Sequence, residues 1–174
     1  MLGRAKDVLQ KEGLIPVLRR GSALVASQFF QYENFYLHEH KLQERNEADF
    51  LPKPQDFTFK MVSSNKEADE LASNIGIDFR KRFVDSRRRL DKGAIAFGIF
   101  VNGEIAHIGW LALSEEAKKA VDSLPFKVDF SNKEACTGGT ATVPEYRGKG
   151  LMVYGYFKRL EFLRERGVIL SRSS

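Results

Sequence analysis

The stretch VPEYRGKGLM, residues 143–152, decides how the C-terminal part of the chain is expected to fold. The strand-like residues 134–143 lead into it, and residues 153–163 carry apolar side chains at helical spacing. A second strand-like run follows at residues 168–171. The order strand, glycine-rich turn, helix, strand is typical of a crossover between parallel strands. Ligands of such units bind beyond the carboxyl end of the first strand, which is where this turn lies.

The turn itself has the chemistry of an anion-binding site. Gly148 and Gly150 let the backbone approach a ligand closely, and a helix that begins near Leu151 leaves its first amides free. Arg147 adds a fork of donors and Lys149 a point charge. The spacing matches neither the P-loop nor the dinucleotide-binding fingerprint. From these residues alone, an ordinary turn with surface charges is the alternative.

Elements upstream of the turn are predicted from alternation, helix caps and turn residues. In chain order they are a strand over residues 56–62, a helix over 64–74, a helix over 78–91, strands over 94–101 and 104–113, and a short helix that Ser114 opens. Ser64 and Glu67 have the spacing of a capping box. Asn102 and Gly103 are a strong hairpin signal, so the strands on either side of them are expected to pair.

The composition indicates one domain of ordinary size with a short extension. The chain has 174 residues, of which 43% are apolar, and this is enough to bury a core. Its single cysteine, Cys136, excludes an internal disulfide and any multi-cysteine zinc site. Because neither a signal peptide nor an apolar run of about 20 residues occurs, we expect a cytoplasmic protein without membrane contact. The net charge of +5 favours an anionic partner only in general terms.

The N-terminal part of the chain is the least legible. Residues 14–42 are rich in aromatics and fit helix and strand patterns about equally. Residues 43–55 are polar and contain Pro52 and Pro54, which disfavour regular structure. We therefore expect residues 1–56 to be an extension and linker, and residues 57–174 to form the domain.

The order of elements, together with Val-Pro-x-x-Arg-Gly-x-Gly-Leu at residues 143–151, resembles the GNAT superfamily of acetyl-CoA-dependent N-acetyltransferases. The family's signature is Arg or Gln, two residues, Gly, one residue, then Gly or Ala. Arg147, Gly150 and Met152 occupy its three key positions, with Met152 in place of the usual small residue. The resemblance covers residues 57–171. It implies an α/β (α+β) fold with a mixed, mostly antiparallel sheet, flanking helices and one parallel βαβ unit at the C-terminus.

The same resemblance implies that acetyl-CoA is the cosubstrate and that no metal is needed. In the family, backbone amides of the turn hold the pyrophosphate of coenzyme A, and the preceding strand pairs with the pantetheine arm. By matching position, the residues that would bind the cofactor are Thr142 and Val143 for the pantetheine, and Arg147, Gly148, Lys149, Gly150, Leu151 and Met152 for the pyrophosphate. Because the donors are mostly backbone amides, variation of the side chains is tolerable.

Two residues are candidates for proton transfer. Glu134, at the start of the strand before the signature, is the best base in the sequence, and family members often use a carboxylate on that strand. A solvated carboxylate is the alternative for Glu134. His107 is a candidate shuttle, although a lone histidine between isoleucines is more often a packed residue. The family continues after residue 171 with a helix and two strands, so we expect a C-terminally incomplete domain whose open sheet edge a second copy of the chain can cover.

Other features favour plainer interpretations. His38 and His40 would share one face of a strand, but two ligands do not predict a metal site. Cys136 and Trp110 are expected in the core. The basic clusters at residues 80–82 and 87–89 are most simply a solvated helix face, with an acidic substrate or nucleic acid as alternatives.

Three functions of different classes follow. The first is an N-acetyltransferase in which a primary amine attacks the thioester of acetyl-CoA directly, and its acceptor is a small molecule or a protein amine. The second is a truncated or degenerate domain that binds coenzyme A without turnover. The third is a basic module associated with nucleic acid, which is the least expected of the three.

Overall fold

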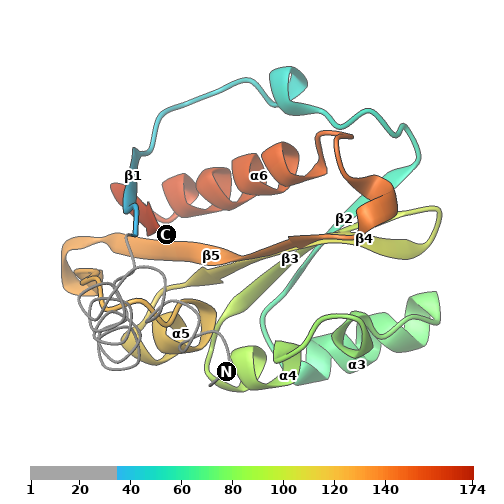
Figure 1. The fold of residues 1–174 in the computed structure, drawn as a ribbon, viewed down its shortest axis with the longest axis horizontal. Helices are drawn as coiled ribbons and strands as arrows, with labels where there is room; N and C mark the ends of the chain where they lie inside the picture. Colours follow the sequence, from blue (N-terminus) through green and yellow to red (C-terminus); the bar gives the residue numbers. More distant parts are fainter. Residues whose placement is uncertain (1–34) are drawn as a thin grey trace, which may run out of the picture. The chain divides into compact units, whose positions relative to one another are not determined.

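A sheet of six strands organises residues 35–174, the part of the chain that the computed structural model describes (Figure 1). Its order is β1-β6-β5-β4-β3-β2. The strands are β1 (His38–Lys41), β2 (Phe57–Val62), β3 (Ile95–Val101), β4 (Glu104–Ala112), β5 (Glu134–Thr142) and β6 (Leu170–Ser173). Neighbouring strands are antiparallel except β5 and β6, which are parallel. The expected mixed, mostly antiparallel sheet with one parallel unit is confirmed.

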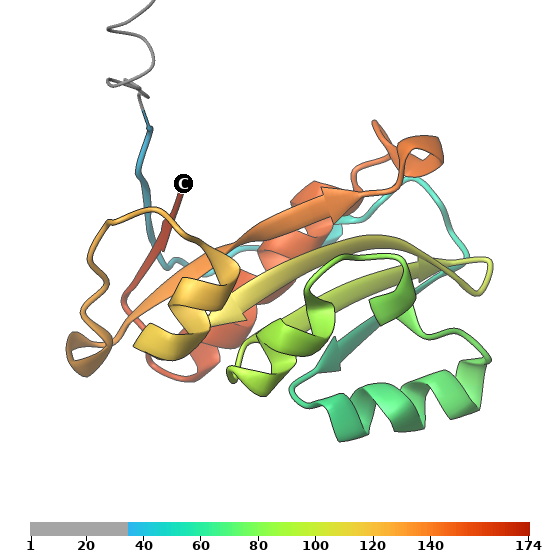
Figure 2. The same ribbon diagram turned by 60° about the horizontal axis from the view of Figure 1, so that its bottom comes forward.

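Helices cover both faces of this sheet. They are α3 (Asn65–Ile75), α4 (Ser86–Asp91), α5 (Glu115–Val121) and α6 (Leu151–Glu165), and 3-10 turns lie at η1 (Glu47–Phe50), η2 (Phe79–Lys81), η3 (Phe130–Asn132) and η4 (Pro144–Tyr146). Figure 2 shows α3, α4 and α5 together on one face, whereas α6 and η1 lie on the other face in Figure 1. Each face therefore has its own apolar core against the sheet.

The core under α3 to α5 contains Trp110 and Cys136, both buried, as expected from the sequence. The core under α6 divides into two clusters, one around Ile99 and Leu151 and the other around Phe97 and Leu163. Because α6 contributes to both of these clusters along its length, the helix is fixed on the sheet from end to end. A fixed helix gives its first turn a defined position beside β5.

The local signals in the sequence mostly act as expected. Ser64 Oγ accepts a hydrogen bond from Glu67 N at 3.1 Å, and the Glu67 carboxylate accepts from Ser63 N rather than from Ser64 N. Asn102 and Gly103 both have positive φ angles, 52° and 79°, as a type I′ hairpin turn requires. The hairpin prediction and the Ser64 cap are confirmed, whereas the reciprocal bond of the capping box, from Ser64 N to Glu67, is replaced by one from Ser63 N.

The helix expected over residues 78–91 is wrong as a single element. It is divided into η2 and the short helix α4, with Asp85 between them at a φ of 66°. Asp78 caps η2 by accepting from Arg80 N at 3.0 Å, and it also accepts from the Arg80 guanidinium. Side-chain hydrogen bonds of this kind satisfy the backbone in a tight turn and compete with a continuous helix.

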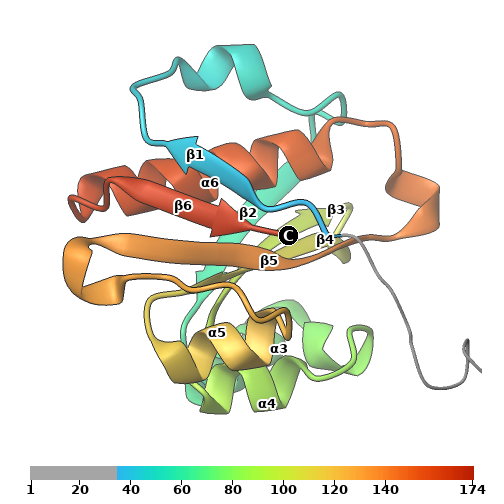
Figure 3. The ribbon, with the colours of Figure 1, turned by 60° about the vertical axis from the view of Figure 1, so that its left-hand side comes forward.

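The edge of β6 is not open. Residues 38–41 form β1 and pair with residues 170–173 in antiparallel register, so β1 covers the edge that a second copy was expected to cover (Figure 3). The compact unit begins at Tyr36, earlier than the domain boundary expected at residue 57. Most of the aromatic-rich run, residues 14–34, lies outside the described residues.

Candidate functional site

Strands β5 and β6 separate soon after they meet. They pair only over residues 134–136 of β5 and 170–172 of β6, whereas β5 continues to Thr142. Within the described part of the chain, residues 137–142 therefore have an edge without a strand partner, and this edge leads directly into the turn at residues 143–150. Unpaired backbone groups along a strand edge can bind an extended ligand.

The turn ends at the start of α6, where the first backbone N–H groups of the helix have no acceptor within it. Gly148 and Gly150 have positive φ angles of 70° and 82°, and Gly150 is the N-cap of α6. The first hydrogen bond of the helix runs from Tyr154 N to Gly150 O at 3.0 Å. The amides of Leu151, Met152 and Val153 thus have no acceptor within the helix, and the helix dipole adds partial positive charge there.

Side chains around the turn leave this face accessible. Leu151 is buried and anchors the helix start, whereas the Met152 side chain is 56% exposed. Arg147 Nε donates to Thr142 O at 3.3 Å, and Lys149 Nζ lies 5.0 Å from the centre of the Tyr146 ring. The Met152 side chain is therefore largely exposed and is not packed into the core beneath the turn.

The segment that precedes β2 packs against the same turn. Lys53 N donates to Lys149 O at 3.0 Å, and Pro52 Cα lies 3.5 Å from where a Cβ on Gly150 would stand. Tyr154 donates from its hydroxyl to Glu47 at 2.6 Å. These contacts fix the turn from outside the signature.

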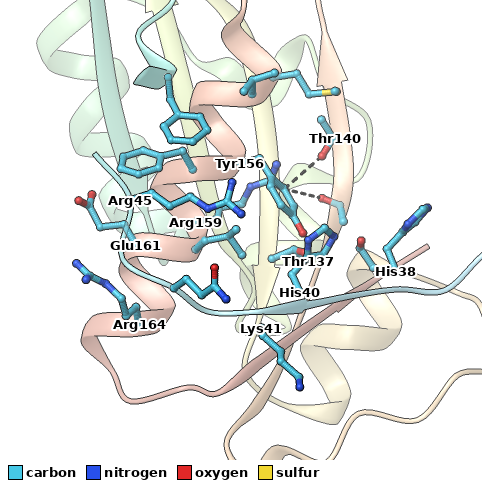
Figure 4. Close-up of a pocket in the computed structure, with 18 of the residues that line it drawn as sticks. His38, His40, Lys41, Arg45, Thr137, Thr140, Tyr156, Arg159, Glu161 and Arg164 are labelled. Carbon is cyan, nitrogen blue, oxygen red and sulfur yellow. Dashed lines mark hydrogen bonds between the residues drawn. The ribbon is translucent and has the colours of Figure 1, made fainter. Parts of the chain in front are cut away.

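A cavity of about 730 Å³ lies along the free edge of β5. Figure 4 shows its residues coming from α6, from β5 and from the segment that begins with β1. The strand edge contributes residues 137–140, and α6 contributes Met152, Val153 and Tyr156 next to the turn. The volume suits a small molecule or an extended cofactor arm.

Arg159 forms part of the cavity wall and is only 1% exposed. Its Nε donates to Gly155 O at 3.1 Å, and its Nη1 donates to Thr140 Oγ1 at 3.2 Å (Figure 4). A Cβ at position 109 would lie 2.5 Å from Arg159 Cζ, so Gly109 makes the space for the guanidinium. Burial lowers the pKa of Arg159 to about 10, which leaves it charged at neutral pH.

Tyr156 covers this arginine. Its ring centre lies 5.1 Å from Arg159 Cζ, and its edge packs on His40 with the ring centres 5.2 Å apart. Burial, and then the nearby His38 and Arg45, lower the pKa of His40. Arg159 Nη2 and the Tyr156 hydroxyl are buried and have no hydrogen-bond partner among the described residues. Buried polar groups without partners are rare in native proteins and point to an absent ligand or water.

The sequence did not identify Arg159 or Tyr156 as site residues. Tyr156 fitted the apolar spacing of the helix, and an arginine on a helix is ordinarily a surface residue. The usable signal was Gly109, whose missing side chain lies against Arg159. That signal requires the pairing of a distant strand and helix, which the sequence does not display.

Glu134 lies far from the turn. β5 has nine residues, so its first residue lies roughly 26 Å from Thr142 at the other end. Glu134 Oε1 accepts from Arg172 at 3.2 Å, and Oε2 accepts from Asp129 N at 2.8 Å. The structure therefore places this carboxylate in an ion pair and outside the cavity.

His107 is fully buried under α6. Its Nδ1 lies 2.8 Å from Thr142 Oγ1, and its ring fills the space that Gly155 leaves. Burial, and then the charge of Arg159, lower the pKa of His107 to about 4. The imidazole is therefore neutral at pH 7, and it does not line the cavity.

Asp122 lies where the two parallel strands separate, and the sequence did not single it out. It follows α5 and is 9% exposed. Its Oδ2 accepts from Ser174 Oγ at 2.6 Å and lies 3.8 Å from where a Cβ on Gly138 would stand. Because Ser174 and Gly138 both line the cavity, the Asp122 carboxylate is connected to the cavity through the Ser174 hydroxyl.

Cys136 and the basic cluster around Arg80 lie in surroundings that fit a structural role. Burial raises the pKa of the Cys136 thiol to about 12. Arg80 is buried between Asp78 and Asp69, which neutralise part of the basic cluster. Within residues 35–174, no group of three metal-ligating side chains occurs, and no helix is long and apolar enough to cross a membrane.

Comparison with solved structures finds a likeness of the fold. The GCN5-related glucosamine N-acetyltransferase region of a fungal multi-domain beta-N-acetylglucosaminidase is similar, with a TM-score of 0.53 and 16% identity over 88% of this chain and 20% of that chain. A predicted acetyltransferase from Clostridium acetobutylicum, solved with acetyl-CoA, matches with a TM-score of 0.40 and 15% identity over 68% of this chain and 80% of that chain. No protein-family model matches, and no curated protein matches.

The chain has the fold of the GNAT acetyltransferases. It spans about a fifth of the length of the fungal protein. The two sequences share few residues, so the likeness defines the fold and leaves activity and substrate to be inferred from the site.

Proposed function

We propose that the chain is an N-acetyltransferase that binds acetyl-CoA and transfers its acetyl group to a primary amine. The observation that carries this proposal is the unpaired edge of β5, residues 137–142, which leads into a turn with free amides at the start of α6. An extended amide-containing arm fits the edge, and a pyrophosphate fits the amides. A molecule with both parts in this order is coenzyme A.

We assign the predicted cofactor residues to two parts of coenzyme A, the pyrophosphate and the pantetheine arm. The amides from Gly148 to Val153, with the charges of Arg147 and Lys149, would hold the pyrophosphate, and Leu151 fixes the helix that carries them. Thr142 and Val143 at the end of β5 would meet the pantetheine arm. Met152 departs from the family's small residue, but its exposed side chain leaves its amide free to donate.

The reaction needs a base, because the amine nitrogen must lose a proton as it bonds to the thioester carbon. The carbon–sulfur bond then breaks, and the thiolate of coenzyme A takes up a proton. Asp122 is best placed to act as the base through the Ser174 hydroxyl. Glu134 and His107 are less suited, because one is ion-paired outside the cavity and the other is buried and neutral.

Titration calorimetry with acetyl-CoA tests this function. Binding in the micromolar range is expected, and absence of binding by the folded chain would contradict both acetyl transfer and simple coenzyme A binding. Release of free thiol from acetyl-CoA in the presence of a panel of amines then separates turnover from binding alone. A cytoplasmic location and the absence of a metal requirement stay predictions.

A further inference from the structure

The half of the cavity farther from the turn is rich in cations. The charged residues that line the cavity are Lys41, whose side chain points away from it, and Arg45, Arg159 and Arg164, against a single acidic residue, Glu161 (Figure 4). Glu161 is already bonded to Lys158, and Arg164 has Glu44 at 3.6 Å near the surface. Arg45 and Arg159 have no carboxylate partner within residues 35–174.

These cations are remote from the turn that is proposed to hold the cofactor phosphates. α6 has 15 residues, and at about 1.5 Å per residue Arg164 lies roughly 20 Å along the helix from Leu151. Arg159 lies between them, and Figure 4 shows Arg45 directed from its segment toward the middle of the cavity, whereas Lys41 points away. A pyrophosphate at the start of α6 therefore does not satisfy Arg45 and Arg159.

Arg159 is costly to keep without a counterion. A buried charge is tolerated when it is paired, and removal from water disfavours it otherwise. Its Nε and Nη1 donate hydrogen bonds to backbone carbonyls and to Thr140, and these bonds give that side of the guanidinium a structural role. Within residues 35–174, Nη2 has no acceptor, and Arg45, a second guanidinium without a carboxylate partner there, lies 5.9 Å from the centre of the Phe50 ring and lines the same cavity.

We infer that the acceptor is an amine that also carries an anionic group, a carboxylate or a phosphate. This inference rests on the proposed function. The anionic group binds Arg45 directly and lies in the field of Arg159, while the amine reaches the separation of β5 and β6 beside Gly138. The amine nitrogen attacks the acetyl carbon, the carbon–sulfur bond breaks, and the proton from nitrogen leaves through Ser174. The anionic group is unchanged in the product.

Matched pairs of amines test the inference. Each pair has one skeleton with and without the anion: glycine and glycinamide, β-alanine and β-alaninamide, glucosamine 6-phosphate and glucosamine. We expect kcat/KM to favour the anionic member of at least one pair by tenfold or more. The first two pairs report on carboxylates and the third on phosphate, so the preferred pair identifies the anion.

Arg45→Gln should reduce this preference at least fivefold and leave the KM for acetyl-CoA within twofold. Arg45 is exposed, so the variant should fold. Lys41→Gln removes the same charge from a side chain that points away, and it should preserve the preference. Both variants are measured with the full chain.

Equal or better use of the neutral amines overturns the inference, as does a change in acetyl-CoA KM without a change in preference in Arg45→Gln. A protein that binds acetyl-CoA but uses neither member of any pair overturns it too. A protein that does not bind acetyl-CoA contradicts the proposed function first, and the inference fails with it. Calorimetry thus separates the two failures.

Discussion

Replacing Met152 with glutamate places a carboxylate beside the amides that are proposed to hold the cofactor pyrophosphate. Because the Met152 side chain is 56% exposed, the new side chain needs no repacking. With two phosphate charges at about 6 Å and the dielectric constant of water, the repulsion is about 1.4 kcal/mol, or about tenfold in affinity. A lower effective dielectric at the protein surface makes the loss larger.

The same substitution should not weaken the fold. A carboxylate in the first turn of a helix interacts favourably with the helix dipole, by about 0.3–1 kcal/mol at low salt. Met152→Glu is therefore expected to unfold at the same or a higher temperature while binding acetyl-CoA less tightly. General damage to the structure would lower the two quantities together, so their opposite signs identify the electrostatic cause.

Calorimetric titration with acetyl-CoA and thermal unfolding measure the two effects. Met152→Gln is the matched control, since it has the same size without the charge, and its affinity should stay within about threefold of the original. The difference between the two variants should shrink as salt is added, because exposed charges are screened. If Met152→Glu binds acetyl-CoA as tightly as Met152→Gln, the pyrophosphate does not lie at the start of α6.

Three further predictions concern the base, the sheet and pH. Asp122→Asn should lower kcat by about 10²–10⁴ and leave acetyl-CoA affinity unchanged by calorimetry; an unaltered kcat would exclude this base. Gly109→Ala should destabilise the protein by about 1–3 kcal/mol in urea unfolding, because its Cβ would lie 2.5 Å from the buried Arg159 guanidinium, and an unchanged midpoint would contradict that packing. His107, with its pKa lowered to about 4, binds a proton only in the unfolded chain between pH 4 and about 6.5, so stability should fall by up to about 3 kcal/mol as pH falls through that range. His107→Gln should flatten the dependence, and an equal slope in the variant would assign it to other groups.

Local signals in the sequence were sufficient for the elements around the signature. The hairpin at Asn102 and Gly103 depends on two residues that adopt positive φ, and the cap at Ser64 depends on one hydroxyl. Both devices act within a few residues of themselves, so their outcome does not depend on the rest of the fold. The turn before α6 belongs to the same class, because its glycines determine where the helix begins.

The predictions of an open sheet edge beside β6 and of a single helix over residues 78–91 were wrong for a different reason. β1 has four residues, and its partner β6 lies at the opposite end of the described chain, so no local pattern marks their pairing. The split at Asp85 accompanies an arginine, Arg80, that is held by its near neighbour Asp78 and by Asp69 on α3. A contact between distant segments decided the pairing of β1, and a local cap together with a contact to α3 decided the split; both override helix propensity.

The same distinction applies to the two halves of the site. The half that would bind the cofactor is built from one continuous run, residues 137–153, and the donors for the pyrophosphate are backbone amides that follow the glycines of the turn. The half that would recognise the acceptor joins Arg45 from the segment after β1 to Arg159 on α6 and to the space at Gly109. β1 brings that segment to the cavity by pairing with β6, while β6 leaves the edge of β5 open by ending early. Residues before the signature domain, expected to be a linker, therefore give the cavity much of its charge and with it the chemistry expected of the acceptor.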